Sequence, residues 1–205
     1  ELTIFSIIVL IFSIVIHEIS HGSVANFLGD PTAKQLGRLS INPLKHIDYF
    51  GTIILPIMLL LASAGQGPVF GWAKPVPINS AAFKNPRWDN MKVALAGPLA
   101  NLLIAVIFGL LIRFLPLPEI ILVLFSIIVL LNILLAVFNL VPIPPLDGSH
   151  ILFGLLPERF WKLKMLLYQY GMFLLILFIF FGLHYLSPLI RGIYFLIAGN
   201  SGQFF

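Results

Sequence analysis

Long apolar segments, separated by short polar or glycine- and proline-rich breaks, run through the chain. The first covers residues 2–28 and ends at a Gly-Asp-Pro turn, which a helix does not readily cross. Three further segments cover residues 89–114, 119–140 and about 165–186. Each of the four is long enough to cross the roughly 30 Å hydrocarbon core of a bilayer as a helix.

Shorter apolar segments leave the number of membrane crossings open. Residues 51–64 contain Pro56 and are short for a full crossing, which takes about 20 residues. A brief helix is expected over residues 149–156, and a short tail after Pro188. The pattern predicts an all-α polytopic integral membrane protein with about five to six transmembrane or half-membrane helices. A small re-entrant or strand region is expected between the first and third apolar segments.

Composition supports this class and narrows the chemistry. The chain is 60% hydrophobic and 10% charged, whereas soluble domains carry about 25% charged residues. No polar stretch reaches the length of a domain, so residues 1–205 are expected to form one membrane-embedded domain. The absence of cysteine means that any metal must be held by nitrogen and oxygen. The net charge is +4, and the basic residues lie in loops between helices, beside tryptophan and proline. This placement favours a lipid bilayer over nucleic acid as the partner.

The basic residues also indicate an orientation. If residues 51–64 dip into the membrane and return, only Arg113 and Arg191 lie on one face. The other basic residues share the opposite face: Lys34, Arg38, Lys45, Lys74, Lys84, Arg87, Lys92, Arg159, Lys162 and Lys164. Cytoplasmic loops are enriched in lysine and arginine, so the crowded face is assigned to the cytoplasm. A full crossing by residues 51–64 would divide these charges, so the re-entrant arrangement is preferred.

Three ionisable residues interrupt the first apolar segment. His17 and His21 lie one helical turn apart, about 6 Å along the axis, and can reach one ion. Together with Glu18 they have the spacing of the zinc-peptidase signature, in which two histidines bind the metal and the glutamate is the general base. Ionisable groups in a membrane segment are costly, which favours a functional role over polar packing.

A catalytic zinc ion needs a third protein ligand. Asp147 is the best candidate among eight acidic residues, because it follows a proline-rich break of the kind that lines cavities at membrane depth. Two alternatives remain open. Asp147 could instead cap the helix that follows it, and His150 could be the ligand.

The chain resembles the site-2 protease family of intramembrane zinc metallopeptidases. The resemblance rests on the His17–His21 motif, on residues 139–148 (NLVPIPPLDG) and on residues 96–101 (AGPLAN). Residues 71–77 (GWAKPVP) resemble a segment frequent in the compact members, which lack a PDZ-like domain. The resemblance covers about residues 14–154, and it implies that the single membrane-embedded domain expected over residues 1–205 is a peptidase domain.

The resemblance also implies a site and a reaction. His17, His21 and Asp147 would hold one Zn²⁺ per chain, and Glu18 would be the general base. Asn139 would position substrate or stabilise the oxyanion, although packing is an alternative. The substrates would be transmembrane proteins cleaved within or near their membrane segments, and the oligomeric state is left open.

Three further residues are expected to bind substrate: Asn101, Trp72 and Lys74. Asn101 could instead join helices by a hydrogen bond, and Trp72 and Lys74 could be interfacial anchors. An extended substrate could pair with residues 71–79 or with residues around 36–41.

Other readings of the polar residues are also open. His46 is expected to face water, and Asn132 to join helices. The functional alternatives are a metal or proton transporter using the same polar cluster, a metalloprotease of another membrane family, or a catalytically silent scaffold. We expect the protein in the plasma membrane of a prokaryote, with its active site towards the cytoplasm.

Overall fold

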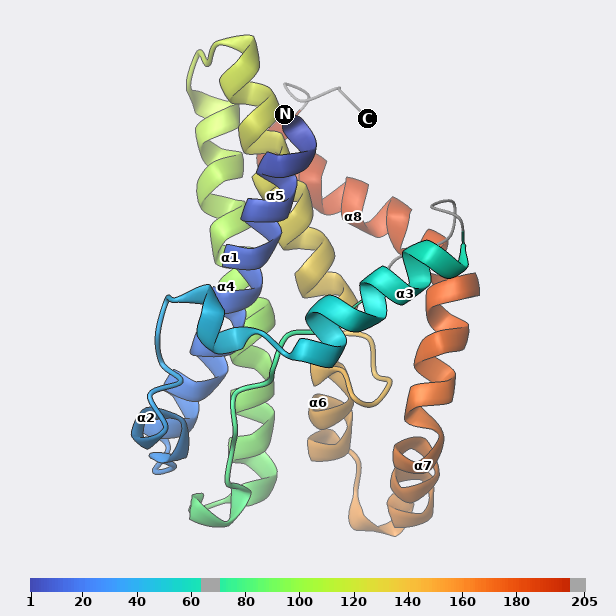
Figure 1. Cartoon of the computed structure of the whole chain (residues 1–205). Coiled ribbons are helices and arrows are strands. Elements are labelled where there is room, and N and C mark those ends of the chain that lie inside the picture. Colours follow the sequence, from blue (N-terminus) through green and yellow to red (C-terminus); the bar gives the residue numbers. More distant parts are fainter. Residues whose placement is uncertain (64–70, 200–205) are drawn as a thin grey trace.

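The computed structural model describes residues 1–63 and 71–199, and throughout these residues it contains helices and no strand (Figure 1). The short elements η1, η3 and η4 are 3-10 helices, and η2 and η5 are π-helices. In chain order the elements are α1 (Leu2–Phe27), α2 (Thr32–Gln35), η1 (Pro43–His46), η2 (Tyr49–Ile54), α3 (Leu55–Ala62), η3 (Ser80–Ala82), α4 (Pro86–Phe114), α5 (Glu119–Asn139), α6 (Asp147–Leu155), η4 (Glu158–Phe160), α7 (Trp161–Leu177), η5 (Phe178–Gly182) and α8 (Leu183–Ala198).

Within residues 1–63 and 71–199, four helical stretches are long and apolar enough to cross a membrane. They are α1, α4, α5 and the continuous run Glu158–Ala198. This confirms the expected all-α membrane class. The expected tail after Pro188 is wrong, because Pro188 lies inside α8. Packing of the far end of α8 against α4 and α5 outweighs the hydrogen bond that proline cannot make.

The scaffold of the molecule is the group of helices α1, α4 and α5, which lie side by side with α8 packed against α4 and α5 (Figure 1). An apolar core joins α4, α5 and α8 through residues such as Ala105, Ile133 and Tyr194. The Tyr194 hydroxyl also shares a 2.8 Å hydrogen bond with the buried Ser126 Oγ of α5. The helices that carry the polar residues are therefore held in fixed relative positions.

The chain leaves this scaffold through η2 and α3 and returns to the point of departure. Trp72 N–H donates to the Gly51 carbonyl at 3.2 Å, and the Thr52 hydroxyl donates to the Trp72 carbonyl at 2.8 Å. Residue 64, the end of the expected 51–64 segment, lies outside the described residues. Because residues 51 and 72 are hydrogen-bonded to each other, the chain departs from the scaffold and returns to it at the same place, as the re-entrant arrangement requires.

The loop after α1 is tied to the extended segment 71–79 by the carboxylate of Asp30. This carboxylate is fully buried, and it accepts hydrogen bonds from the Thr32 N–H and hydroxyl and, at 2.6 Å, from the Asn79 N–H. Burial alone would raise the pKa of Asp30, but the hydrogen bonds from Thr32 and Asn79 outweigh it and lower the pKa.

His46, which was expected to face water, is buried instead. Its loop packs on segment 71–79, and the His46 carbonyl accepts a hydrogen bond from the Lys74 N–H at 2.9 Å.

Replacing Asp30 with Asn should lower the free energy of unfolding by about 1–3 kcal/mol, because an amide NH₂ would face a donor in place of one carboxylate oxygen. Thermal unfolding in detergent at neutral pH measures this. The lowered pKa means that the carboxylate stabilises the fold above its unfolded-state pKa of about 3.9 and loses this effect as pH falls through the native value. The difference in the free energy of unfolding between Asp30→Asn and the wild type should therefore shrink in acid. Asp48→Asn is the control, since Asn keeps the oxygen that caps Gly51 N–H; an equal loss in both variants would contradict the prediction.

Candidate active site

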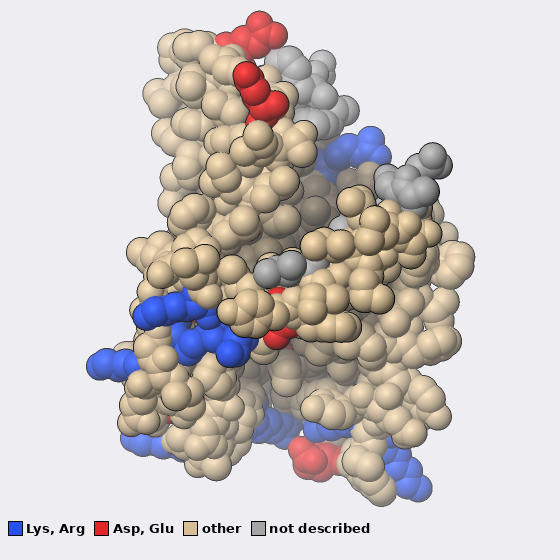
Figure 2. Space-filling model, in the orientation of Figure 1, with Lys and Arg blue, Asp and Glu red and all other residues tan. Residues whose placement is uncertain are grey.

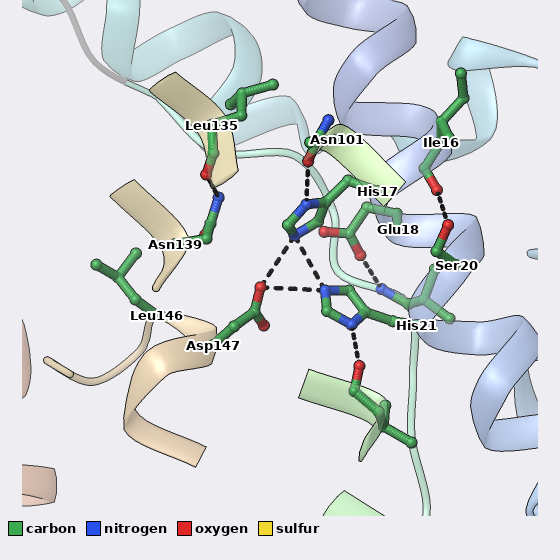
Figure 3. Close-up of polar contacts among 12 residues, drawn as sticks. Ile16, His17, Glu18, Ser20, His21, Asn101, Leu135, Asn139, Leu146 and Asp147 are labelled. Carbon is green, nitrogen blue, oxygen red and sulfur yellow. Dashed lines mark hydrogen bonds and ion pairs between the residues drawn. The ribbon is translucent and has the colours of Figure 1, made fainter. Parts of the chain in front are cut away.

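Three side chains converge where α1 meets the start of α6 (Figure 3). His17 and His21 are buried, and their Nε2 atoms lie 3.0 Å apart. Asp147 Oδ2 lies 3.0 Å from His17 Nε2 and 3.2 Å from His21 Nε2. Ligands held about 2.1 Å from one tetrahedral zinc ion are about 3.4 Å apart, so this spacing fits a zinc ion.

Helix α4 decides which nitrogen of each histidine faces the cluster. His21 Nδ1 lies 2.6 Å from the Val93 carbonyl, and His17 Nδ1 lies 2.6 Å from Asn101 Oδ1. Each Nδ1 therefore carries the proton and donates it, which leaves a lone pair on each Nε2. The cluster then consists of three acceptors with no donor among them, an arrangement that a cation satisfies.

A stripe along α4 makes this arrangement sterically feasible. Val93, Gly97 and Asn101 are four residues apart and therefore lie on one face of the helix. A Cβ on Gly97 would lie 2.4 Å from His21 Nε2 and 2.6 Å from His17 Nε2. Only glycine lets α4 approach the histidine pair this closely. The sequence motif at residues 96–101 contains Gly97 and Asn101. Val93 contributes a backbone carbonyl, which any residue would supply. Its position four residues before Gly97 is the signal in the sequence that places it on the same helix face.

The proline-rich break positions Asp147 at the first residue of α6. Gly148 packs so tightly against the end of α5 that a Cβ there would lie 2.2 Å from the Leu140 carbonyl oxygen. The N-cap residue of α6 is Leu146, with no side-chain cap, and the carboxylate of Asp147 points to the histidines instead. His150 is exposed and is not part of the three-residue cluster. The geometry favours Asp147 over both alternatives.

Glu18 is half-buried beside the histidines and contacts the extended segment 71–79. Its Oε2 accepts a hydrogen bond from the Val76 N–H at 2.8 Å. Arg38 Nη2 holds the same segment by donating to the carbonyls of Lys74 at 2.8 Å and Pro75 at 3.3 Å. This part of the segment therefore lies alongside the candidate base.

The remaining expected residues lie in three different places. Asn101 is fully buried under His17, whereas Trp72 and Lys74 are exposed on the extended segment. Asn139 lies at the end of α5 on the Asp147 side of the site, and its Nδ2 donates to the Leu135 carbonyl at 2.9 Å (Figure 3). Contact of these four residues with substrate stays a prediction, and the burial of Asn101 favours a role behind the candidate metal ligands.

Comparison with known proteins agrees with the geometry. The chain is 43% identical over 160 residues to "Putative zinc metalloprotease YwhC" of Bacillus subtilis (strain 168), covering 74% of the chain and 68% of that protein. It is 32% identical over 144 residues to "Putative zinc metalloprotease Rip2" of Mycolicibacterium smegmatis, covering 67% of the chain and about half (52%) of that protein. No solved structure matches the chain.

A family model extends the comparison over most of the chain. The model for peptidase family M50 matches residues 5–121 and 117–178, which include α1, the metal-site stripe on α4 and Asp147. This match confirms the resemblance drawn from the motifs, and the absence of a polar insertion fits the compact form. The chain is an all-helical integral membrane protein, and it belongs to peptidase family M50, the site-2 protease family.

Proposed function

We propose that the chain is an intramembrane zinc metalloendopeptidase that hydrolyses peptide bonds within or near transmembrane segments of other membrane proteins. One observation carries the proposal: three acceptor atoms from His17, His21 and Asp147 converge beside the carboxylate of Glu18 (Figure 3). Zinc is the cofactor, in agreement with the names of both relatives. Residues 1–205 act as one peptidase domain in this proposal.

The residues present divide the work of peptide hydrolysis. Zinc, held by His17 Nε2, His21 Nε2 and Asp147 Oδ2, would supply Lewis acidity that acidifies water and polarises a carbonyl. Glu18 takes a proton from the attacking water and returns it to the leaving amine. The Val76 N–H holds Glu18 Oε2, which leaves Oε1 to carry that proton. Asn139 lies on the other side of the site, where its amide would stabilise the oxyanion or position substrate.

Substrate is expected along the extended segment 71–79. A transmembrane helix hides its peptide bonds in internal hydrogen bonds, so it must unwind locally before cleavage. The exposed Trp72 and Lys74 shortly precede Val76, the residue of this segment that bonds to the base. An unwound substrate chain lying there would bring its backbone next to Glu18.

The basic side of the molecule supports a cytoplasmic orientation of the site. Most of the lysine and arginine visible in Figure 2 lies in its lower half, towards the end of α1. Both histidines lie in the second half of α1, nearer this basic side than the opposite one. Under the positive-inside rule, the site opens towards the cytoplasm, in the plasma membrane of a prokaryote.

Metal removal tests the proposal. Detergent-purified protein should contain one zinc per chain and cleave members of a panel of single-span membrane proteins. Chelation should abolish cleavage, and added zinc should restore it, because the ligands persist without the ion. Asp147→Ala should bind zinc more weakly, since it loses one of three ligand atoms.

The assay also separates the rival functions. A wild-type protein that binds no stoichiometric metal would overturn the proposal. Zinc bound without cleavage of any panel member, together with metal or proton flux in proteoliposomes, would establish the transporter instead.

A further inference from the structure

We propose that Asn132 of α5 is a positioning residue that acts through Asn101 to fix the protonated nitrogen of His17, and so prepares His17 Nε2 to bind zinc. The inference rests on the proposed function and assigns a role to a residue that does not touch the metal cluster. Asn132 and Asn101 are both fully buried, and they connect α5 to α4 and α1 inside the scaffold.

The direction of this hydrogen-bonded chain is set at its far end by the backbone of α5. Asn132 Nδ2 lies 2.9 Å from the Ile128 carbonyl and 3.0 Å from Ser13 Oγ. A backbone carbonyl only accepts, so the NH₂ group of Asn132 must face it. The Oδ1 atom of Asn132 therefore faces the other way, towards Asn101.

Asn101 passes the direction on to His17. Its Nδ2 donates to Asn132 Oδ1 at 2.9 Å and to the Ser13 carbonyl at 3.3 Å. Its Oδ1 is then the atom that faces His17 Nδ1 at 2.6 Å, and it requires a proton on that nitrogen. The result is a lone pair on His17 Nε2, the form that binds a metal ion.

The opposite arrangement of these groups is disfavoured. A proton on His17 Nε2 would turn Nδ1 into an acceptor and reverse both amides. Asn132 Oδ1 would then face the Ile128 carbonyl, and Asn101 Oδ1 would face the Ser13 carbonyl. Each of these two pairs would bring two acceptor oxygens together with no hydrogen between them. Asn101 and Asn132 are both 0% exposed, and unpaired polar groups are most costly at such buried positions. Helix joining alone would not require this direction.

Zinc affinity of purified protein, measured by competition with a chromophoric chelator, tests the inference. Asn132→Leu removes the shorter of the two bonds that orient the Asn101 amide and leaves only the 3.3 Å bond to the Ser13 carbonyl. It should weaken zinc binding about tenfold, at the low end for partners of metal ligands. Asn132→Ser is the second variant, because its hydroxyl can bond the Ile128 carbonyl of its own helix but is too short to reach Asn101. It should show the same loss even if the leucine variant fails to fold.

Ser126→Ala is the matched control. It removes a buried hydrogen bond of the same helix, to Tyr194, that has no connection to His17. It should lower the melting temperature of the metal-free protein and leave zinc affinity unchanged. Wild-type zinc affinity in Asn132→Ser would overturn the inference, as would an equal loss of affinity in Ser126→Ala. Absence of zinc binding by the wild type would overturn the proposed function itself.

Discussion

Glu18→Gln should retain bound zinc and lose peptide hydrolysis by about 10²- to 10⁴-fold, the range for removal of a general base. Glutamine has the shape of glutamate, and its carbonyl oxygen can still accept the Val76 N–H. It cannot take a proton from water at neutral pH. Zinc content and the cleavage rate of a single-span substrate, measured on the same preparation, separate the two effects.

Ser20→Ala is the control for the Glu18 variant. Ser20 lies on the same helix, and its hydroxyl donates to the Ile16 carbonyl of the preceding turn. This variant should cleave at the wild-type rate. Near-normal cleavage by Glu18→Gln would remove the general-base role and favour a different proton acceptor.

Gly97→Ala should weaken zinc binding by about 100-fold or more, because it disturbs two ligands at once. The added methyl group would lie far inside van der Waals contact of both His17 and His21. The atoms that it meets are ring atoms held by short hydrogen bonds to α4, so they cannot swing away without losing their partners. Zinc titration of the purified variant measures the effect.

The control for this variant is Gly192→Ala, on α8. A Cβ at Gly192 meets nothing within 4 Å among the residues that the structure describes, so the variant reports the same chemical change without a clash there. It should bind zinc as the wild type does. Wild-type zinc affinity in Gly97→Ala would show that α4 can move away from α1, against the close packing on which the site depends.

Some parts of the site could be predicted because they follow from local spacing. His17 and His21 share a helix face whatever surrounds them, and a run of apolar residues as long as α1 predicts a membrane helix by itself. Asp147 could be identified as the candidate third ligand because the chain has only eight acidic residues to choose from. These inferences need no knowledge of how the helices pack.

Other parts could not be predicted because they depend on packing between distant segments. The Val93 carbonyl is a backbone atom that any residue would supply, so the sequence carries no mark of its bond to His21. His46 is buried because a distant segment folds over its loop. Likewise, α8 continues through Pro188 because it packs on α4 and α5.

The proposed metal ligands and the proposed base depend on different kinds of backbone. His17 and His21 take their orienting bonds from the regular helix α4, whereas Glu18 takes its bond from an irregular segment held by Arg38 and Asp30. Loops tolerate sequence change better than packed helices do. We therefore expect substitutions around Trp72 and Lys74 to change which peptides are accepted while zinc affinity is retained. Under the proposed function, new targets can then be acquired without rebuilding the metal site.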